Sequence, residues 1–172
     1  MGTPPNKKVI ALRVLITGAL VLSGWLTGGT VDRFVVQFPA WRHIAISQWA
    51  AFSRHADMGN GLFLYPFEAI GSFILLLAAA VIILQSKPYL RTVALPVYCA
   101  VVFAALGLFF TIYAAPVMLS IRTENDPLFL QHAFDSFYFW SAYRVIVQVL
   151  SFFCCIWAMA RASGIKWVVI AK

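Results

Sequence analysis

Two charged residues lie inside long apolar stretches of the chain. Glu68 and Arg144 each stand about seven residues into an apolar run, at residues 62–85 and 137–160 respectively. A charge in hydrocarbon costs several kcal/mol unless it is paired or faces water. Because the two charges are opposite and have similar depths in their runs, we expect Glu68 and Arg144 to form an ion pair.

Arg144 also belongs to a row of side chains with helical spacing. Residues three or four positions apart share one face of a helix, and the other members of this face are Ser141, Gln148, Ser151 and Cys155. The opposite face consists of Val, Leu, Phe and Ile residues. The pattern predicts that the polar face points into the protein rather than toward lipid.

This polar layer has two interpretations. In the first, it lines a pocket for a polar or aromatic small molecule, which Glu68 and Arg144 orient while Tyr113 and Trp140 stack on it. In the second, the same groups form a satisfied network that fixes how the helices pack. The candidate ligand-binding residues of the first interpretation are Glu68, Tyr113, Trp140, Ser141, Arg144 and Gln148.

Histidines and aspartates precede two of the apolar runs. His55 and Asp57 lie just before the run at 62–85, and His132 and Asp135 lie just before the run at 137–160. Two histidines with carboxylates would suit non-haem iron, zinc or copper. No established metal-binding spacing accompanies them, and exposed loop residues are the alternative interpretation. No cofactor is assigned.

The composition indicates which elements position these side chains. Only 11% of the 172 residues are charged and 62% are apolar, whereas a soluble domain has about a quarter charged residues. About 20 helical residues cross a bilayer, and four apolar runs are long enough: 14–31, 62–85, 93–121 and 137–160. We therefore expect residues 1–172 to form a single membrane domain, an all-α integral membrane antiparallel four-helix bundle.

The charge distribution predicts an orientation in the membrane. The net charge is +7, and the basic residues cluster near both termini and in the loop at 86–92, which contains Lys87 and Arg91. The acidic residues lie mainly in the segments 32–61 and 122–136. The positive-inside rule places both termini in the cytoplasm, and we expect a bacterial cytoplasmic membrane. A surface that binds nucleic acid would not separate basic and acidic residues into alternate loops, so nucleic acid is not expected as a partner.

Residues 40–55 have the pattern of an amphipathic helix at the outer interface. Aromatic and small residues gather on one side at helical spacing and polar residues on the other. Such a helix is either a lid over a cavity or an anchored connector. The first side contains Trp41, Ala45, Trp49 and Phe52, and the second contains His43, Ser47 and Arg54.

Several short motifs resemble one known family. They are Trp140-Ser-Ala-Tyr-Arg144, Pro116 after a run that contains Thr111, the loop with Asn125 and Asp126, Pro39-Ala40-Trp41, Asn60, and Tyr65-Pro66. With the length and the number of spans, the chain resembles the anthrone oxygenase-like family of small four-helix membrane proteins, most of which is a domain of unknown function. The resemblance implies the bundle and an oxygenase-like activity. The chain departs from the family pattern at Val117-Met118 and at Ser141-Ala142.

The sequence is compatible with three functions. The first is binding of a small molecule, such as a hydrophobic aromatic compound, in the outer half of the bundle, with oxygenase-like chemistry if the resemblance extends to activity. The second is a non-catalytic accessory subunit of a larger membrane complex. The third is a small transporter or channel, for which four spans leave little room.

Overall fold

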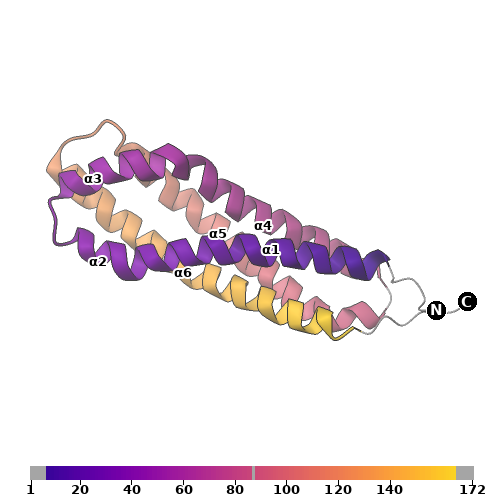
Figure 1. Ribbon diagram of the computed structural model, residues 1–172. Coiled ribbons are helices and arrows are strands. Elements are labelled where there is room, and N and C mark those ends of the chain that lie inside the picture. Colours follow the sequence, from indigo (N-terminus) through magenta and orange to yellow (C-terminus); the bar gives the residue numbers. More distant parts are fainter. Residues whose placement is uncertain (1–6, 87, 166–172) are drawn as a thin grey trace, which may run out of the picture.

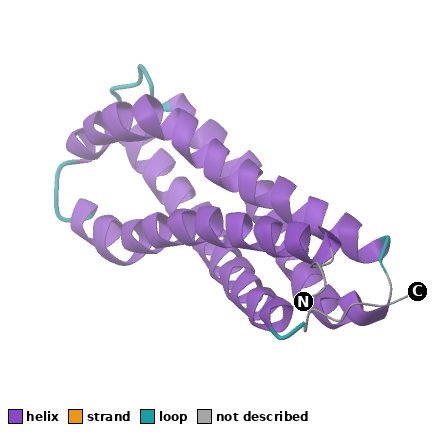
Figure 2. Cartoon of the chain, turned by 45° about the vertical axis from the view of Figure 1, so that its right-hand side comes forward, coloured by secondary structure: helices purple, strands orange, loops and turns teal. Residues whose placement is uncertain are grey.

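The structure is a computed structural model that describes residues 7–86 and 88–165. Its regular elements are helices, and the described residues contain no strand (Figure 2). The predicted all-α class is therefore confirmed. Lys87, used above to orient the chain, lies outside the described residues, as do the basic residues after position 165.

Four helical segments are long and apolar enough to cross a membrane, which is the number predicted from the sequence. The first two segments each combine several elements, joined by π-helical turns. In chain order the elements are α1 (Lys7–Asp32), η1 (Arg33–Gln37), α2 (Phe38–Trp41), α3 (Ile46–His55), η2 (Ala56–Asn60), α4 (Gly61–Leu84), the 3₁₀ turn η3 (Pro88–Val93), α5 (Ala94–Ser120) and α6 (Pro127–Ser163).

The prediction of one continuous helix over residues 40–55 is wrong. α2 ends at Trp41, a turn follows, and the extended backbone at Ala45 (φ −62°, ψ 137°) separates it from α3. The turn lets α3 pack on α6, where Trp49 is fully buried edge-on to Phe134 with ring centroids 5.1 Å apart. Burial of this indole shows that the aromatic side of α3 faces the protein, which does not distinguish a lid from an anchored connector.

The beginning of α6 is set by polar residues that hydropathy does not detect. Asp126 has an extended backbone conformation, and its carboxylate accepts a hydrogen bond from the backbone N–H of Leu128 at 3.2 Å. Pro127 follows at the first helical position, which suits its fixed φ and missing donor. The helix therefore begins well before the apolar run at 137–160 and includes most of the predicted loop at 122–136.

The four long helices lie side by side, with α2 and α3 at the end opposite the beginning of α1 (Figure 1). α1 packs against α4 and α6, and α5 packs against the same two helices. Near the beginning of α1, Arg13 Nη2 donates to the carbonyl oxygens of Ala162 (2.9 Å) and Ile165 (3.0 Å). A cation there complements the carbonyls at the end of α6.

Glycines let α1 approach its neighbours closely along part of its length. A Cβ atom at Gly24 would lie 2.9 Å from the ring of Phe152 on α6, and one at Gly18 would lie 3.0 Å from Leu75 on α4. A Cβ atom at Gly28 would have no neighbouring atom within 4 Å. The helices therefore pack tightly up to Gly24 and are less closely packed around Gly28.

Candidate functional site

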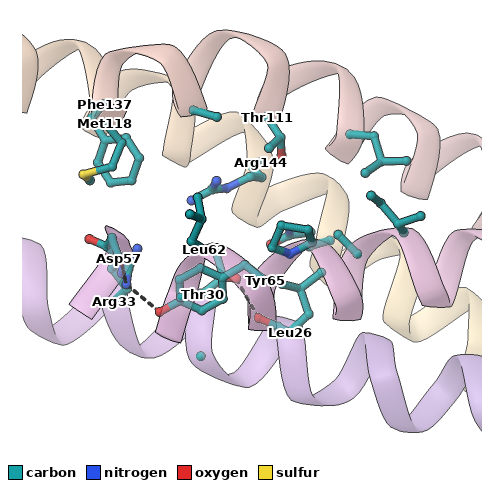
Figure 3. Close-up of a pocket in the computed structure, with 18 of the residues that line it drawn as sticks. Leu26, Thr30, Arg33, Asp57, Leu62, Tyr65, Thr111, Met118, Phe137 and Arg144 are labelled. Carbon is teal, nitrogen blue, oxygen red and sulfur yellow. Dashed lines mark hydrogen bonds and ion pairs between the residues drawn. The ribbon is translucent and has the colours of Figure 1, made fainter. Parts of the chain in front are cut away.

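A cavity of about 300 Å³ lies between α1, α4, α5 and α6, beyond the tightly packed part of α1 (Figure 3). This volume is at the lower end of the range of ligand-binding pockets. Most of the wall is apolar. Its polar and ionisable side chains are Thr30, Arg33, Asp57, Tyr65, Thr111, Arg144 and Gln148.

Some residues of the wall are also exposed, and they mark where the cavity reaches the protein surface. Leu62 (44% exposed) and Ile70 (47%) belong to α4, and Leu119 (45%) belongs to α5. All three side chains are apolar. The exposed part of the wall is therefore largely apolar, and it also includes Tyr65 of α4 (37% exposed).

An ion pair lies at the end of the cavity formed by η1 and η2. Arg33 Nη2 contacts Asp57 Oδ1 and donates a hydrogen bond to Tyr65 Oη at 2.8 Å. Both charged residues are buried, with 9% of Arg33 and 7% of Asp57 exposed. The second carboxylate oxygen of Asp57 is buried without a hydrogen-bond partner among the described residues.

Arg144 reaches into the cavity from the middle part of α6 (Figure 3). Its Nε atom is buried, and the described residues offer it no hydrogen-bond acceptor. Its guanidinium carbon lies 5.7 Å from the centroid of the Phe137 ring. The wall thus contains one arginine in direct contact with a carboxylate, Arg33, and one without a recorded hydrogen bond or ion pair, Arg144.

The predicted ion pair between Glu68 and Arg144 is not formed. Glu68 is 2% exposed, its Oε1 atom lacks a partner among the described residues, and the side chain is not part of the cavity wall. Tyr65 and Ala69 of α4 do line the cavity, and each residue turns a helix by about 100°. Glu68 therefore lies at a different angle around α4 from the residues that line the cavity.

The inward-pointing polar face of α6 is confirmed. Ser141, Gln148, Ser151 and Cys155 are all buried. Gln148 lines the cavity, and its Oε1 atom has no hydrogen-bond partner in the described part of the chain. Ser141 is buried outside the cavity wall, also with an unpartnered hydroxyl.

The two aromatic residues predicted to stack on a ligand lie outside this cavity. Tyr113 and Trp140 stack on each other, with ring centroids 4.8 Å apart and an angle of 21° between the rings. Tyr113 is 44% exposed. These rings therefore belong to an aromatic surface of α5 and α6.

The predicted metal centre is not assembled. Among the described residues, no three His, Cys, Asp or Glu side chains come together as metal ligands would. Asp57 is paired with Arg33 instead. His55, His132 and Asp135 are exposed.

Arg33 and Tyr65 are site residues that the sequence reasoning missed. Arg33 was expected in an outer loop, because the apolar run at 14–31 ends just before it. The helix in fact continues through η1, which carries Arg33 into the wall. A useful signal was the apolar sequence Phe34-Val-Val that follows Arg33, which extends the apolar stretch beyond the charge.

The comparisons with known proteins complete the description of the site. No protein-family model, curated protein or solved structure matches the chain. The resemblance to the anthrone oxygenase-like family therefore stays a prediction.

Proposed function

We propose that this chain is an integral membrane protein that binds a small molecule with a largely apolar body inside an antiparallel four-helix bundle. Four apolar helical segments support membrane insertion. By the positive-inside rule, the end with α2 and α3 faces outward and both termini are cytoplasmic. The cavity then lies in the outer half of the bundle.

The observation that carries the binding proposal is the cavity with its unpartnered polar atoms. A network that served only to fix helix packing would satisfy its own donors and acceptors, because an unpaired buried polar group is costly. In this wall, Arg144 Nε, Gln148 Oε1 and Asp57 Oδ2 have no partner among the described residues. Convergent, unsatisfied groups in an apolar pocket are typical of ligand sites.

The test fills the cavity by mutation. Ala115 of α5 lines the cavity, so Ala115→Phe places a ring in it. Ala105, on the same helix, is exposed and lies outside the wall, so Ala105→Phe is the matched control. Native mass spectrometry of protein purified in mild detergent should detect a bound small molecule on the wild type and on Ala105→Phe, and none on Ala115→Phe.

Two results would contradict binding in this cavity. One is a bound molecule that stays on Ala115→Phe at the wild-type occupancy, which would place it elsewhere on the protein. The other is wild-type protein that carries no small molecule and co-purifies with further subunits, which would favour the accessory-subunit function.

The accessory-subunit alternative has an observation of its own. Exposed and half-buried aromatic rings adjoin one another along α5 and α6, where neighbouring centroids are 4.8 to 6.4 Å apart. A partner helix could pack there. The surface contains Phe109, Phe110, Tyr113, Phe139, Trp140 and Tyr143.

Oxygenase-like conversion of the bound molecule rests on the family resemblance alone. Incubating the purified protein and its bound molecule under oxygen and under argon tests it, with product mass as the readout. A mass gain that requires oxygen and is lost in Ala115→Phe would support an enzyme, and an unchanged mass would favour a binding protein.

A further inference from the structure

The charges of the cavity wall do not balance. Arg33 and Arg144 are positive, and Asp57 is the one carboxylate among the residues that form this wall. Arg33 contacts that carboxylate directly. The wall therefore carries one net positive charge: Arg33 repels Arg144, and Asp57 attracts Arg144 but is already in contact with Arg33.

An uncompensated charge in such a place destabilises the protein that contains it. Breaking a buried pair costs several kcal/mol because the remaining charge has lost its solvent and gained no partner. Part of this cost applies to Arg144, which is half-buried and whose Nε atom is fully buried. The described part of the chain offers its Nε atom no hydrogen-bond acceptor. A residue that costs stability and points into a cavity is typical of a binding group.

We propose that the ligand of this cavity carries a monoanionic head group, which binds Arg144, on an apolar body. This inference rests on the proposed binding function and adds the chemical class of the ligand. One negative charge would neutralise the wall, and a carboxylate or phosphate oxygen matches the guanidinium as an acceptor. The apolar body faces Phe137, Leu62 and Ile70, which also belong to the wall.

The remaining unpartnered atoms refine the head group. Gln148 Oε1 and Asp57 Oδ2 are unpartnered acceptors. A hydroxyl or N–H group beside the acid group of the ligand could therefore donate a hydrogen bond to one of them. An organic acid with a hydroxyl substituent therefore fits this wall better than a simple acid. A second anionic group would find no further positive charge, because Arg33 is paired with Asp57.

The experiment compares two probes that differ in the head group. The probes are 2-naphthoate and 2-naphthylmethanol, titrated calorimetrically into protein in nonionic detergent at pH 7. Wild type should bind the acid at least about tenfold more tightly than the alcohol, since hydrogen bonds to charged groups are worth more than neutral ones. Arg144→Gln should lose this preference and keep its affinity for the alcohol.

A second readout separates ligand binding from a structural role of Arg144. Without ligand, Arg144→Gln should melt at the wild-type temperature or above it, because the variant removes an unpaired charge. A large fall in its melting temperature would mean that Arg144 has a structural partner, and it would overturn the inference. Arg144→Lys keeps the charge and should retain part of the preference for the acid.

The outcomes distinguish this inference from the proposed function. If both probes bind wild type equally and neither binds Ala115→Phe, the cavity is a binding site but its ligand is not an anion. If neither probe binds wild type better than Ala115→Phe, the proposed binding function fails as well.

The anion could belong to a free acid or to a lipid. Repeating the naphthoate titration in nanodiscs of phosphatidylcholine, with and without phosphatidylglycerol, distinguishes the two. Competition by phosphatidylglycerol would assign the head group to an anionic phospholipid, and unchanged naphthoate affinity would assign it to a free acid.

Discussion

Replacing Asp57 with alanine should destabilise the protein strongly. The substitution leaves Arg33, 9% exposed, with Tyr65 Oη as its remaining recorded partner. Removing one member of a buried ion pair costs about 3–5 kcal/mol because the other charge stays buried. Because Arg33 borders a cavity that can admit water, we expect the lower value of about 3 kcal/mol.

In a protein of this size, such a loss corresponds to a fall of roughly 6–12 °C in the melting temperature. Intrinsic tryptophan fluorescence during heating in detergent measures it. Asp135 is the control, because it is an exposed carboxylate at the same end of the protein, and Asp135→Ala should change stability by less than about 0.5 kcal/mol.

A double variant tests the cause. Arg33→Met with Asp57→Leu removes both charges and should recover most of the lost stability, since replacing a buried pair by apolar side chains is often neutral. If Asp57→Ala melts within about 2 °C of wild type, or if the double variant is less stable than Asp57→Ala alone, the ion pair does not stabilise this end of the protein.

Two further predictions concern packing and loop contacts. Gly24→Ala should lower the melting temperature, because its Cβ would lie 2.9 Å from the ring of Phe152. The control Gly28→Ala has open space and should be neutral or stabilising by up to about 1 kcal/mol. Equal melting temperatures of the two variants would contradict the close contact at Gly24. Arg54→Ala should speed amide exchange in the α5–α6 connection, whose carbonyl oxygens accept hydrogen bonds from Arg54. His55→Ala, at an exposed neighbouring position, is its control, and equal exchange in both variants would refute that role.

The sequence was sufficient to predict the long elements of the fold. Hydropathy alone predicts four apolar segments, and the ends of α4 and α5 fall within a residue of the runs at 62–85 and 93–121. It could not predict where α1 and α6 extend beyond their apolar runs. Those extensions depend on local backbone cues, such as the Asp126 cap, and on packing between distant segments.

The candidate site was predicted in part. Helical spacing correctly indicated that Arg144 and Gln148 face inward. It could not indicate that Glu68 turns away from Arg144, because spacing within one helix says nothing about rotation relative to another. The contact between Arg33 and Asp57 depends on the turn after α2, which folds two halves of a predicted loop onto each other.

The contacts of Arg54 have a consequence for how molecules reach the cavity. Arg54 Nε donates to the carbonyl oxygen of Ile121 at 2.9 Å, and Nη2 contacts Glu124 and Asn125, so α3 is fastened to the α5–α6 connection. η2 follows α3 directly and supplies Asp57 to the cavity wall. With that end held, the exposed apolar wall residues of α4 and α5 offer a route into the cavity, and in the proposed membrane orientation they would face hydrocarbon. Occupancy would then follow the mole fraction of ligand dissolved in the lipid rather than its concentration in water.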